Sequence, residues 1–321
     1  MTLRIGTRGS ELALYQANAV GSRLRANAGV DCEIVVIRTS GDRLAEAPLT
    51  QIGGKRLFVK EIEDALLAGE VDLAVHSSKD MPAVLPEGLA IAAVLPREDP
   101  RDAVVLPGEP VELSFEALVS QLGDRPRIGT SSVRRVAQLA RLFPGATFLP
   151  IRGNLGTRLR KLDEGQYDAL VLASAGLIRL GHRERISAVL PAAACVPAPG
   201  QGIIAIEIRS GDERVAEPLR AIDDDLARAA LDAERTVVST LGGGCQMPIG
   251  AHATIENGEM TLMAVVLALD GARALRTESR GSMTEPLTVG RTAAESLLSQ
   301  GADAILEEVR RAHAAVEGIQ P

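Results

Sequence analysis

The chain opens with two apolar strands separated by an amphipathic helix. Residues 3–6 and 32–39 are nearly continuous apolar runs, and between them apolar positions recur at helical spacing over residues 11–26. Continuous apolar strands are typical of a sheet that helices cover on both faces. We therefore expect the β-α-β start of an α/β domain.

This alternation of strands and helices continues to about residue 240. Further strands are expected near residues 71–75, 89–95, 103–106, 127–129, 148–151, 169–173 and 203–209. Further helices are expected near 59–67, 212–220 and 223–240, from about residue 114, directly after the serines at 131–132, and around Arg158. Proline and charge interrupt the pattern at 97–102, and proline and glycine interrupt it at 195–202, as expected of connections between domains. The strand 203–209, which follows the second connector, is able to rejoin the first sheet and make the first domain discontinuous. Periodicity alone does not decide whether it does.

The pattern changes after residue 248. Three strands are expected over 249–256, 260–269 and 272–280, followed by helices near 285–299 and 303–316. Asn257-Gly258 and Asp270-Gly271 separate the strands, and both dipeptides favour tight type I′ hairpin turns. The last part of the chain is thus predicted to be a small antiparallel sheet covered by helices.

Composition narrows the classes of function. The 321 residues are 46% hydrophobic and 24% charged, with a net charge of −7 and 2% aromatic residues. This balance disfavours a general nucleic-acid binder, and no apolar run approaches the ~20 residues that cross a bilayer. Three widely spaced cysteines imply no disulfide framework, and the first residues have no signal-peptide pattern. We expect a cytoplasmic protein without membrane or nucleic-acid partners.

Several common chemistries lack their motifs. No two of the four histidines have the spacing of metal ligands, so no metal site is expected. The nucleophile motif GxSxG is absent, and no GxGxxG follows the first strand. Hydrolases of the Ser-His-Asp type and nucleotide-dependent dehydrogenases are therefore disfavoured.

Arginines stand at the ends of predicted strands, where open α/β sheets bind ligands. Only four of the 35 basic residues are lysines. Arg8 follows the first strand, Arg134 and Arg135 follow the serines at 131–132, and Arg152 follows the strand near 148–151. Guanidinium groups and helix N-termini both bind anions, so a small ligand with carboxylates is expected. As neighbours on a helix, Arg134 and Arg135 are not expected to point the same way.

Cys245 lies in the loop 241–250, after three glycines and before Pro248. Glycines remove side-chain bulk and permit unusual backbone angles, so a large group can approach the thiol. Taken alone, the loop fits equally well a tight turn with an incidental cysteine and a cysteine that tethers a ligand.

Seven segments together resemble the porphobilinogen deaminase family. They are Thr-Arg-Gly-Ser at 7–10, Gly-Gly-Lys-Arg-Leu-Phe-Val-Lys-Glu at 53–61, His-Ser-Ser-Lys-Asp-Met-Pro at 76–82, Gly-Thr-Ser-Ser-Val-Arg-Arg at 129–135, Arg-Gly-Asn at 152–154 with Thr-Arg at 157–158, Pro-Ala-Pro-Gly-Gln-Gly at 197–202, and Gly-Gly-Cys-Gln-Met-Pro-Ile-Gly at 243–250. The resemblance implies two α/β domains like those of periplasmic binding proteins and a C-terminal α+β domain with a three-stranded antiparallel sheet. The implied limits are 1–100 with 201–220, 101–200, and 221–321.

The resemblance also implies the activity and the site. Four porphobilinogen molecules would be condensed head to tail with loss of ammonia, and the chain hydrolysed to hydroxymethylbilane, as in tetrapyrrole biosynthesis. Cys245 would carry a dipyrromethane cofactor, and Asp80 would be the catalytic carboxylate. The other implied cofactor contacts are Arg8, Ser10, Lys79, Asp80, Ser132, Arg134, Arg135, Arg152, Arg158 and Gln201. The implied substrate contacts are Arg8, Phe58, Arg152, Arg158 and Arg179.

Some features of the chain leave room for other interpretations. Arg56 and Gln51 differ from residues common in the family, and they fall in the segment 40–60, a candidate lid over the site. A two-lobed anion-binding protein without catalysis would use the same arginines but would need neither Asp80 nor Cys245. An acyl transferase with Cys245 as nucleophile would need a nearby histidine. The family expectation is a monomer.

Overall fold

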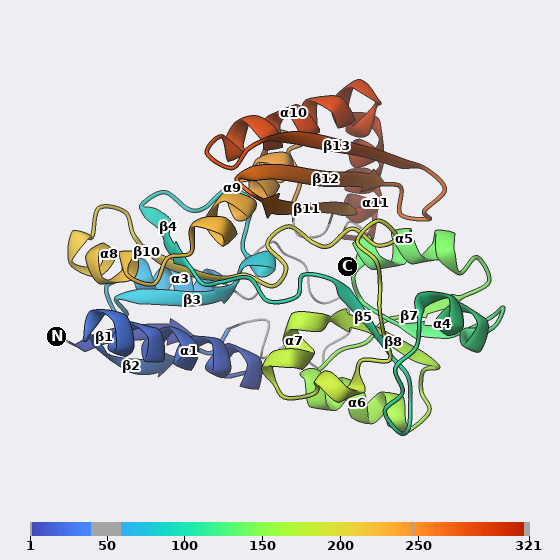
Figure 1. Ribbon diagram of the computed structural model, residues 1–321, viewed down its shortest axis with the longest axis horizontal. Helices are drawn as coiled ribbons and strands as arrows, with labels where there is room; N and C mark the ends of the chain where they lie inside the picture. The colour runs from blue at the N-terminus through green and yellow to red at the C-terminus, as the bar shows by residue number, and fades with distance from the viewer. Residues whose placement is uncertain (1, 40–58, 245–246, 318–321) are drawn as a thin grey trace.

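The computed structural model describes residues 2–39, 59–244 and 247–317. Strands of this part of the chain form three sheets, two of five strands and one of three (Figure 1). None of the described helices is both long enough and apolar enough to cross a membrane.

The first sheet combines strands from two distant stretches of sequence. Its order is β2-β1-β3-β10-β4, and the bounds are β1 (Thr2–Thr7), β2 (Asp31–Val36), β3 (Leu73–Ser77), β4 (Leu89–Val94) and β10 (Ile204–Arg209). β10 runs antiparallel between β3 and β4. Helices α1 (Glu11–Ala28) and α8 (Glu213–Arg220) share an apolar cluster on one face, and α3 (Lys60–Leu67) belongs to another cluster. Strand 203–209 thus rejoins the first sheet.

The second sheet repeats this order with strands from one continuous stretch. Its order is β7-β6-β8-β5-β9, and the bounds are β5 (Asp102–Val105), β6 (Arg127–Gly129), β7 (Thr147–Leu149), β8 (Ala169–Ala173) and β9 (Ala188–Val189). Its helices are α4 (Phe115–Leu122), α5 (Val133–Leu142), α6 (Leu155–Asp163) and α7 (Ser174–Arg179). β5 is the antiparallel strand beside β8, in the place that β10 takes beside β3. The two sheets therefore share the order and directions of their strands, although the antiparallel strand comes last in the sequence of the first sheet and first in that of the second.

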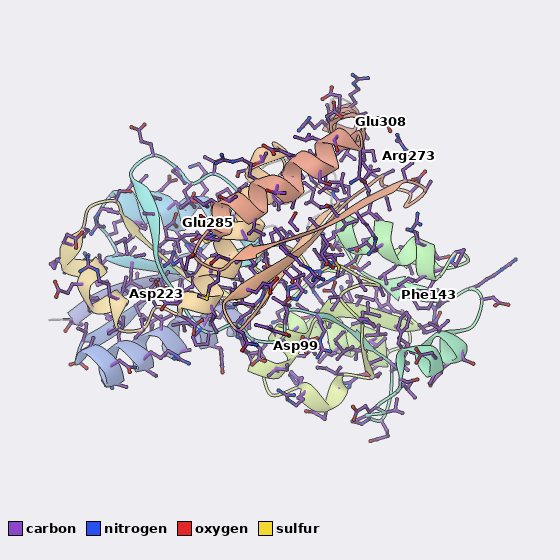
Figure 2. The ribbon with its side chains drawn as sticks, turned by 45° about the horizontal axis from the view of Figure 1, so that its top comes forward. Asp99, Phe143, Asp223, Arg273, Glu285 and Glu308 are labelled. Carbon is purple, nitrogen blue, oxygen red and sulfur yellow. The ribbon has the colours of Figure 1, made fainter. Side chains whose placement is uncertain are left out.

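The third sheet, β11-β12-β13, is antiparallel throughout. Its strands are β11 (Ile249–Glu256), β12 (Glu259–Leu267) and β13 (Ala274–Ser282), and its helices are α9 (Asp225–Thr240), α10 (Pro286–Ser299) and α11 (Ala302–Glu317). The helices and the sheet share one apolar cluster, and Val265 and Leu267 pack instead with Ala137 and Val196 of the second domain. Figure 2 shows Arg273, the residue before β13, close to Glu308 of α11, its ion-pair partner. The predicted fold class is confirmed, while the exact domain limits stay a prediction.

The two hairpins of this sheet differ. Asn257 and Gly258 have φ angles of 52° and 81°, as a type I′ turn requires, so that prediction is confirmed. The type I′ turn predicted at Asp270-Gly271 is wrong, because of the two residues only Gly271 has positive φ and the connection is longer. A Cβ on Gly271 would lie 2.4 Å from the carbonyl oxygen of Ala137, and Arg141 donates to the Gly271 carbonyl at 3.0 Å. Docking onto α5 thus determines this turn.

Candidate functional site

The turn after β3 forms a wall between two hollows. Ser77 and Asp80 line one of them, and Ser78 and Lys79 line the other. The short 3-10 helix over Ser78–Asp80 produces this division, because its consecutive side chains point in different directions. Lys79 and Asp80 are neighbours in sequence but therefore line different hollows.

We call the first space the α1 hollow, because the N-terminal half of α1 forms much of its lining. It brings together three predicted site residues, Arg8, Ser10 and Asp80. Ser10 also caps α1 by accepting a hydrogen bond from the backbone N–H of Ala13 at 3.4 Å. The complete lining is Arg8, Ser10, Leu12, Ala13, Gln16, Val59, Val75, His76, Ser77 and Asp80.

Gln16 is a member of this hollow that sequence reasoning missed. It is buried, and its Nε2 donates to Ser77 Oγ at 2.8 Å. An amide on the apolar face of a helix was the available signal, since buried polar groups are normally hydrogen-bonded. Gln16 thereby holds the hydroxyl of Ser77, three residues before Asp80, in place.

We call the second space the α9 hollow, because Arg235 and Val238 of α9 contribute to it. It brings together Lys79, Ser132 and Arg134. Gly244 and Met247 also line it, and they are the described residues on either side of positions 245–246. The complete lining is Ser78, Lys79, Met81, Ala83, Ser132, Arg134, Ala198, Pro199, Arg235, Val238, Gly244, Met247 and Ile249. Cys245, Phe58, Arg56 and Gln51 lie outside the described residues.

A buried carboxylate, Asp102, binds Arg134 and Arg135, two of the three arginines of α5. Arg134 donates to its two oxygens at 2.8 and 3.2 Å, and Arg135 donates to Oδ1 from Nε at 3.0 Å and from Nη2 at 2.8 Å. The expectation that these neighbouring arginines diverge is therefore wrong. Their long side chains both bend toward the start of β5, where Asp102 accepts four hydrogen bonds from them.

Gln201 belongs to the same cluster. Its side chain is buried, and Nε2 donates to Asp102 Oδ1 at 2.9 Å and to the carbonyl oxygen of Pro100 at 2.6 Å. Residues 100 and 201 lie in the two connections between the first and second sheets. Gln201 thus holds these connections together next to the arginines, and it lines neither hollow.

Burial and charge shift several pKa values in this region. The pKa of Asp102 lies far below its usual range, because Arg134 and Arg135 outweigh the cost of burial. Burial, with the charges of Arg135 and Arg134, lowers the pKa of Lys79 to about 8, against the opposing charges of Asp80 and Asp102. Burial and the Asp102 charge raise the pKa of the Cys195 thiol to about 12. Cys195 is therefore protonated at neutral pH and unsuited to attack an electrophile.

Two further predicted arginines, Arg152 and Arg158, follow strand β7 of the second sheet, Arg158 within α6. Arg158 donates from Nε to the Gly153 carbonyl at 2.9 Å, and burial together with the charges of Arg135 and Arg152 lowers its pKa, while Asp80 opposes this. Arg158 thus interacts electrostatically with Asp80 across the domain boundary. Within the described chain, the Arg152 guanidinium has no hydrogen-bond or ion-pair partner.

Arg179 has a different environment. Its Nη2 donates to the Gly202 carbonyl at 2.7 Å, and burial lowers its pKa. It lines neither hollow, and its hydrogen bond is to the residue that follows Gln201. No group of three or more His, Cys, Asp or Glu residues suited to a metal ion occurs in the described ranges.

Comparison with known proteins identifies the family. A family model described as "porphobilinogen deaminase, dipyromethane cofactor binding domain" matches residues 3–217, and one described as "porphobilinogen deaminase, C-terminal domain" matches 229–299. The chain belongs to the porphobilinogen deaminase family. The porphobilinogen deaminase of Syntrophobacter fumaroxidans is 47% identical over 97% of this chain and 98% of the relative. That of Desulforudis audaxviator is 48% identical over 95% and 97%.

Two solved structures with low sequence identity also resemble part of the chain. The periplasmic VFT2 domain of Bordetella pertussis BvgS is 19% identical, covers 69% of this chain and 86% of its own, and has a TM-score of 0.39. An ancestral arginine-binding protein is 16% identical over 69% of this chain and 90% of its own, with a TM-score of 0.36. The cofactor-binding model covers the whole lining of the α1 hollow and the lining of the α9 hollow up to Pro199. The remaining lining residues of the α9 hollow fall within the match of the C-terminal model.

Proposed function

We propose that this chain is a transferase that condenses four porphobilinogen molecules on a dipyrromethane cofactor and hydrolyses the product to hydroxymethylbilane. In each addition the aminomethyl C–N bond of porphobilinogen breaks and its nitrogen leaves as ammonia. The observation that carries the proposal is the Lys79–Asp80 turn, a shared wall between a hollow beside the cysteine loop and a hollow beside Arg8. A growing chain and an incoming unit need two such adjacent spaces.

The residues of the α9 hollow suit a dipyrromethane attached to Cys245. Its acetate and propionate groups are anions, and the hollow offers the cations Lys79 and Arg134 together with the hydroxyl of Ser132. Gly243 and Gly244 keep side chains away from the loop, and a Cβ on Gly243 would lie 2.5 Å from Ile249 Cδ1. When bound, the cofactor supplies the pyrrole carbon to which the first substrate unit is joined.

The residues of the α1 hollow suit the incoming porphobilinogen. Arg8 and Ser10 are placed to bind its carboxylates, and Arg158 adds a positive charge from the second domain. Asp80, exposed to this space, is placed to stabilise the positive charge that develops as ammonia leaves and to hold a proton from a pyrrole nitrogen. We therefore assign binding to the arginines and the proton-handling role to Asp80.

The tethering role of Cys245 predicts a covalent adduct. The denatured wild-type protein should exceed its sequence mass by two pyrrole units, and Cys245→Ser should have only its sequence mass, because the thioether cannot form. Intact-mass spectrometry measures both. Cys32→Ser, which removes a half-buried thiol of β2, is the control and should keep the adduct. An active wild-type protein of unmodified mass would overturn the tether and the proposed function.

The low pKa of Lys79 predicts a pH dependence of cofactor assembly. Below about pH 8 the amine is charged and attracts carboxylates, and above this value the charge is lost. Assembly can be followed by mass in protein from cells that make no porphobilinogen, over about pH 7 to 9. The second-order rate constant of cofactor assembly should be measured for wild type and for Lys79→Arg. The ratio of the wild-type value to the variant value should fall as pH rises through about 8, because arginine stays charged. A constant ratio would exclude this role for Lys79.

A further inference from the structure

Ser78, one of the residues that line the α9 hollow, has a buried hydroxyl that sequence reasoning passed over. Ser78 is 3% exposed, and among the described residues its Oγ has no hydrogen-bond partner. The Ser78 backbone is satisfied, since its N–H donates to Ile203 O at 3.0 Å and its carbonyl accepts from Met81 N at 3.1 Å. Only the hydroxyl is left over, and leaving a buried polar group unpaired is unfavourable.

The neighbouring serine does not share this property. Ser77 Oγ exchanges hydrogen bonds with Gln16, at 2.8 Å to Nε2 and 3.1 Å to Oε1. The two serines line different hollows, Ser77 the α1 hollow and Ser78 the α9 hollow. Gln16 thus provides the hydrogen-bond partner of the Ser77 hydroxyl. The Ser78 hydroxyl has none among the described residues, and Ser78 lines the hollow beside the cysteine loop.

The surroundings of Ser78 determine what kind of group would satisfy it. A Cβ on Gly200 would lie 2.5 Å from Ser78 Oγ, and Gly200 has a φ of 71°, so no side chain from this position can cover the hydroxyl. Lys79 and Arg134 line the same hollow, and both are donors without acceptor capacity. The group that all three would bind is therefore an acceptor, and a carboxylate matches their charge.

We infer that Ser78 Oγ donates a hydrogen bond to a carboxylate of the cofactor, beside Lys79 and Arg134. This inference rests on the proposed function, because it needs a dipyrromethane in the α9 hollow. It makes Ser78 a further binding residue, whose hydroxyl is unfavourable in the protein without cofactor and favourable once the cofactor is assembled.

Ser78→Ala tests the inference in protein that is isolated without cofactor and then given porphobilinogen. The rate at which the two-pyrrole adduct appears by intact mass should fall on the order of tenfold, because a hydrogen bond to a charged group is lost. The melting temperature should also be measured before and after assembly. The increase on assembly should be smaller in Ser78→Ala than in wild type, while the variant without cofactor should melt at or above the wild-type temperature.

Ser174→Ala is the matched control. Ser174 Oγ is also buried without a partner in the described chain, but Ser174 lines neither hollow. Its removal should change the melting temperatures with and without cofactor equally and leave the assembly rate unchanged. If Ser78→Ala behaves like this control, the contact does not exist, while the proposed function stands. If wild type gains no adduct, the proposed function fails and the inference falls with it.

Discussion

Replacing Asp80 with asparagine should remove nearly all turnover while the cofactor stays attached. Asparagine keeps the size of the side chain but cannot carry the negative charge that opposes the developing cation, nor hold the proton. General acid–base groups contribute roughly 10²–10⁴-fold, so a loss of this order is expected. Asp80 lies on the wall between the hollows, exposed to the α1 hollow. Product formation measured on protein of confirmed mass separates turnover from cofactor content.

Asp64→Asn is the control for this change. Asp64 is an exposed carboxylate of the same domain, and its ion-pair partner among the described residues is Lys60 of its own helix, at 2.6 Å. Such surface pairs contribute about 0–1 kcal/mol, so Asp64→Asn should match wild type. Substantial residual turnover in Asp80→Asn would remove Asp80 from the central role. Loss of the adduct would instead assign it to cofactor binding.

Asp102→Asn should be the most destabilising single change near the site. Arg134 and Arg135 are buried and donate four hydrogen bonds to this carboxylate, so its neutralisation leaves two buried positive charges without compensation. Removing one partner of a buried ion pair costs about 3–5 kcal/mol. Denaturant unfolding at neutral pH measures the difference in free energy. An effect below about 1 kcal/mol would show that the cluster contributes no more than a surface pair.

The pH dependence of stability offers a second measurement on the same residue. The pKa of Asp102 is lowered in the folded protein, so its contribution is present above the unfolded-state value of about 4 and is lost as pH falls below it. The acid limb of the wild-type stability curve should therefore be steeper than that of Asp102→Asn. Asp168→Asn is the matched control, because Asp168 also binds an arginine, Arg127 at 2.7 Å, but at the surface.

Local patterns predicted most of the fold. Apolar runs located the strands, and polar residues such as Ser10 and Ser132 marked helix starts, where their side chains accept from backbone N–H groups. These signals are short-range, so they are readable from neighbouring residues. The turn at Asp270-Gly271 was mispredicted because α5, more than 100 residues away, determines it.

The candidate site was predictable only in part for the same reason. The positions of Arg134, Arg135 and Gln201 were expected from the family resemblance. Their common partner Asp102 was not, because the contact to Gln201 spans 99 residues of chain. An acidic residue at the start of an apolar strand carries no signal of its own. Which hydroxyl is satisfied, that of Ser77 or Ser78, likewise depends on a helix 61 residues away.

The late position of β10 in the sequence affects the order in which the two α/β domains can be completed during synthesis. All five strands of the second sheet come from residues 102–189, so this sheet can close as soon as that stretch has left the ribosome. The first sheet is completed only after residues 204–209 have been made, because β10 is the one strand with which β4 pairs in the described part of the chain. The N-terminal domain, synthesised first, is thus completed after the one that follows it. Until then β3, which pairs with β1, has one open edge and β4 lacks its partner β10, and such exposed strand edges are prone to aggregation.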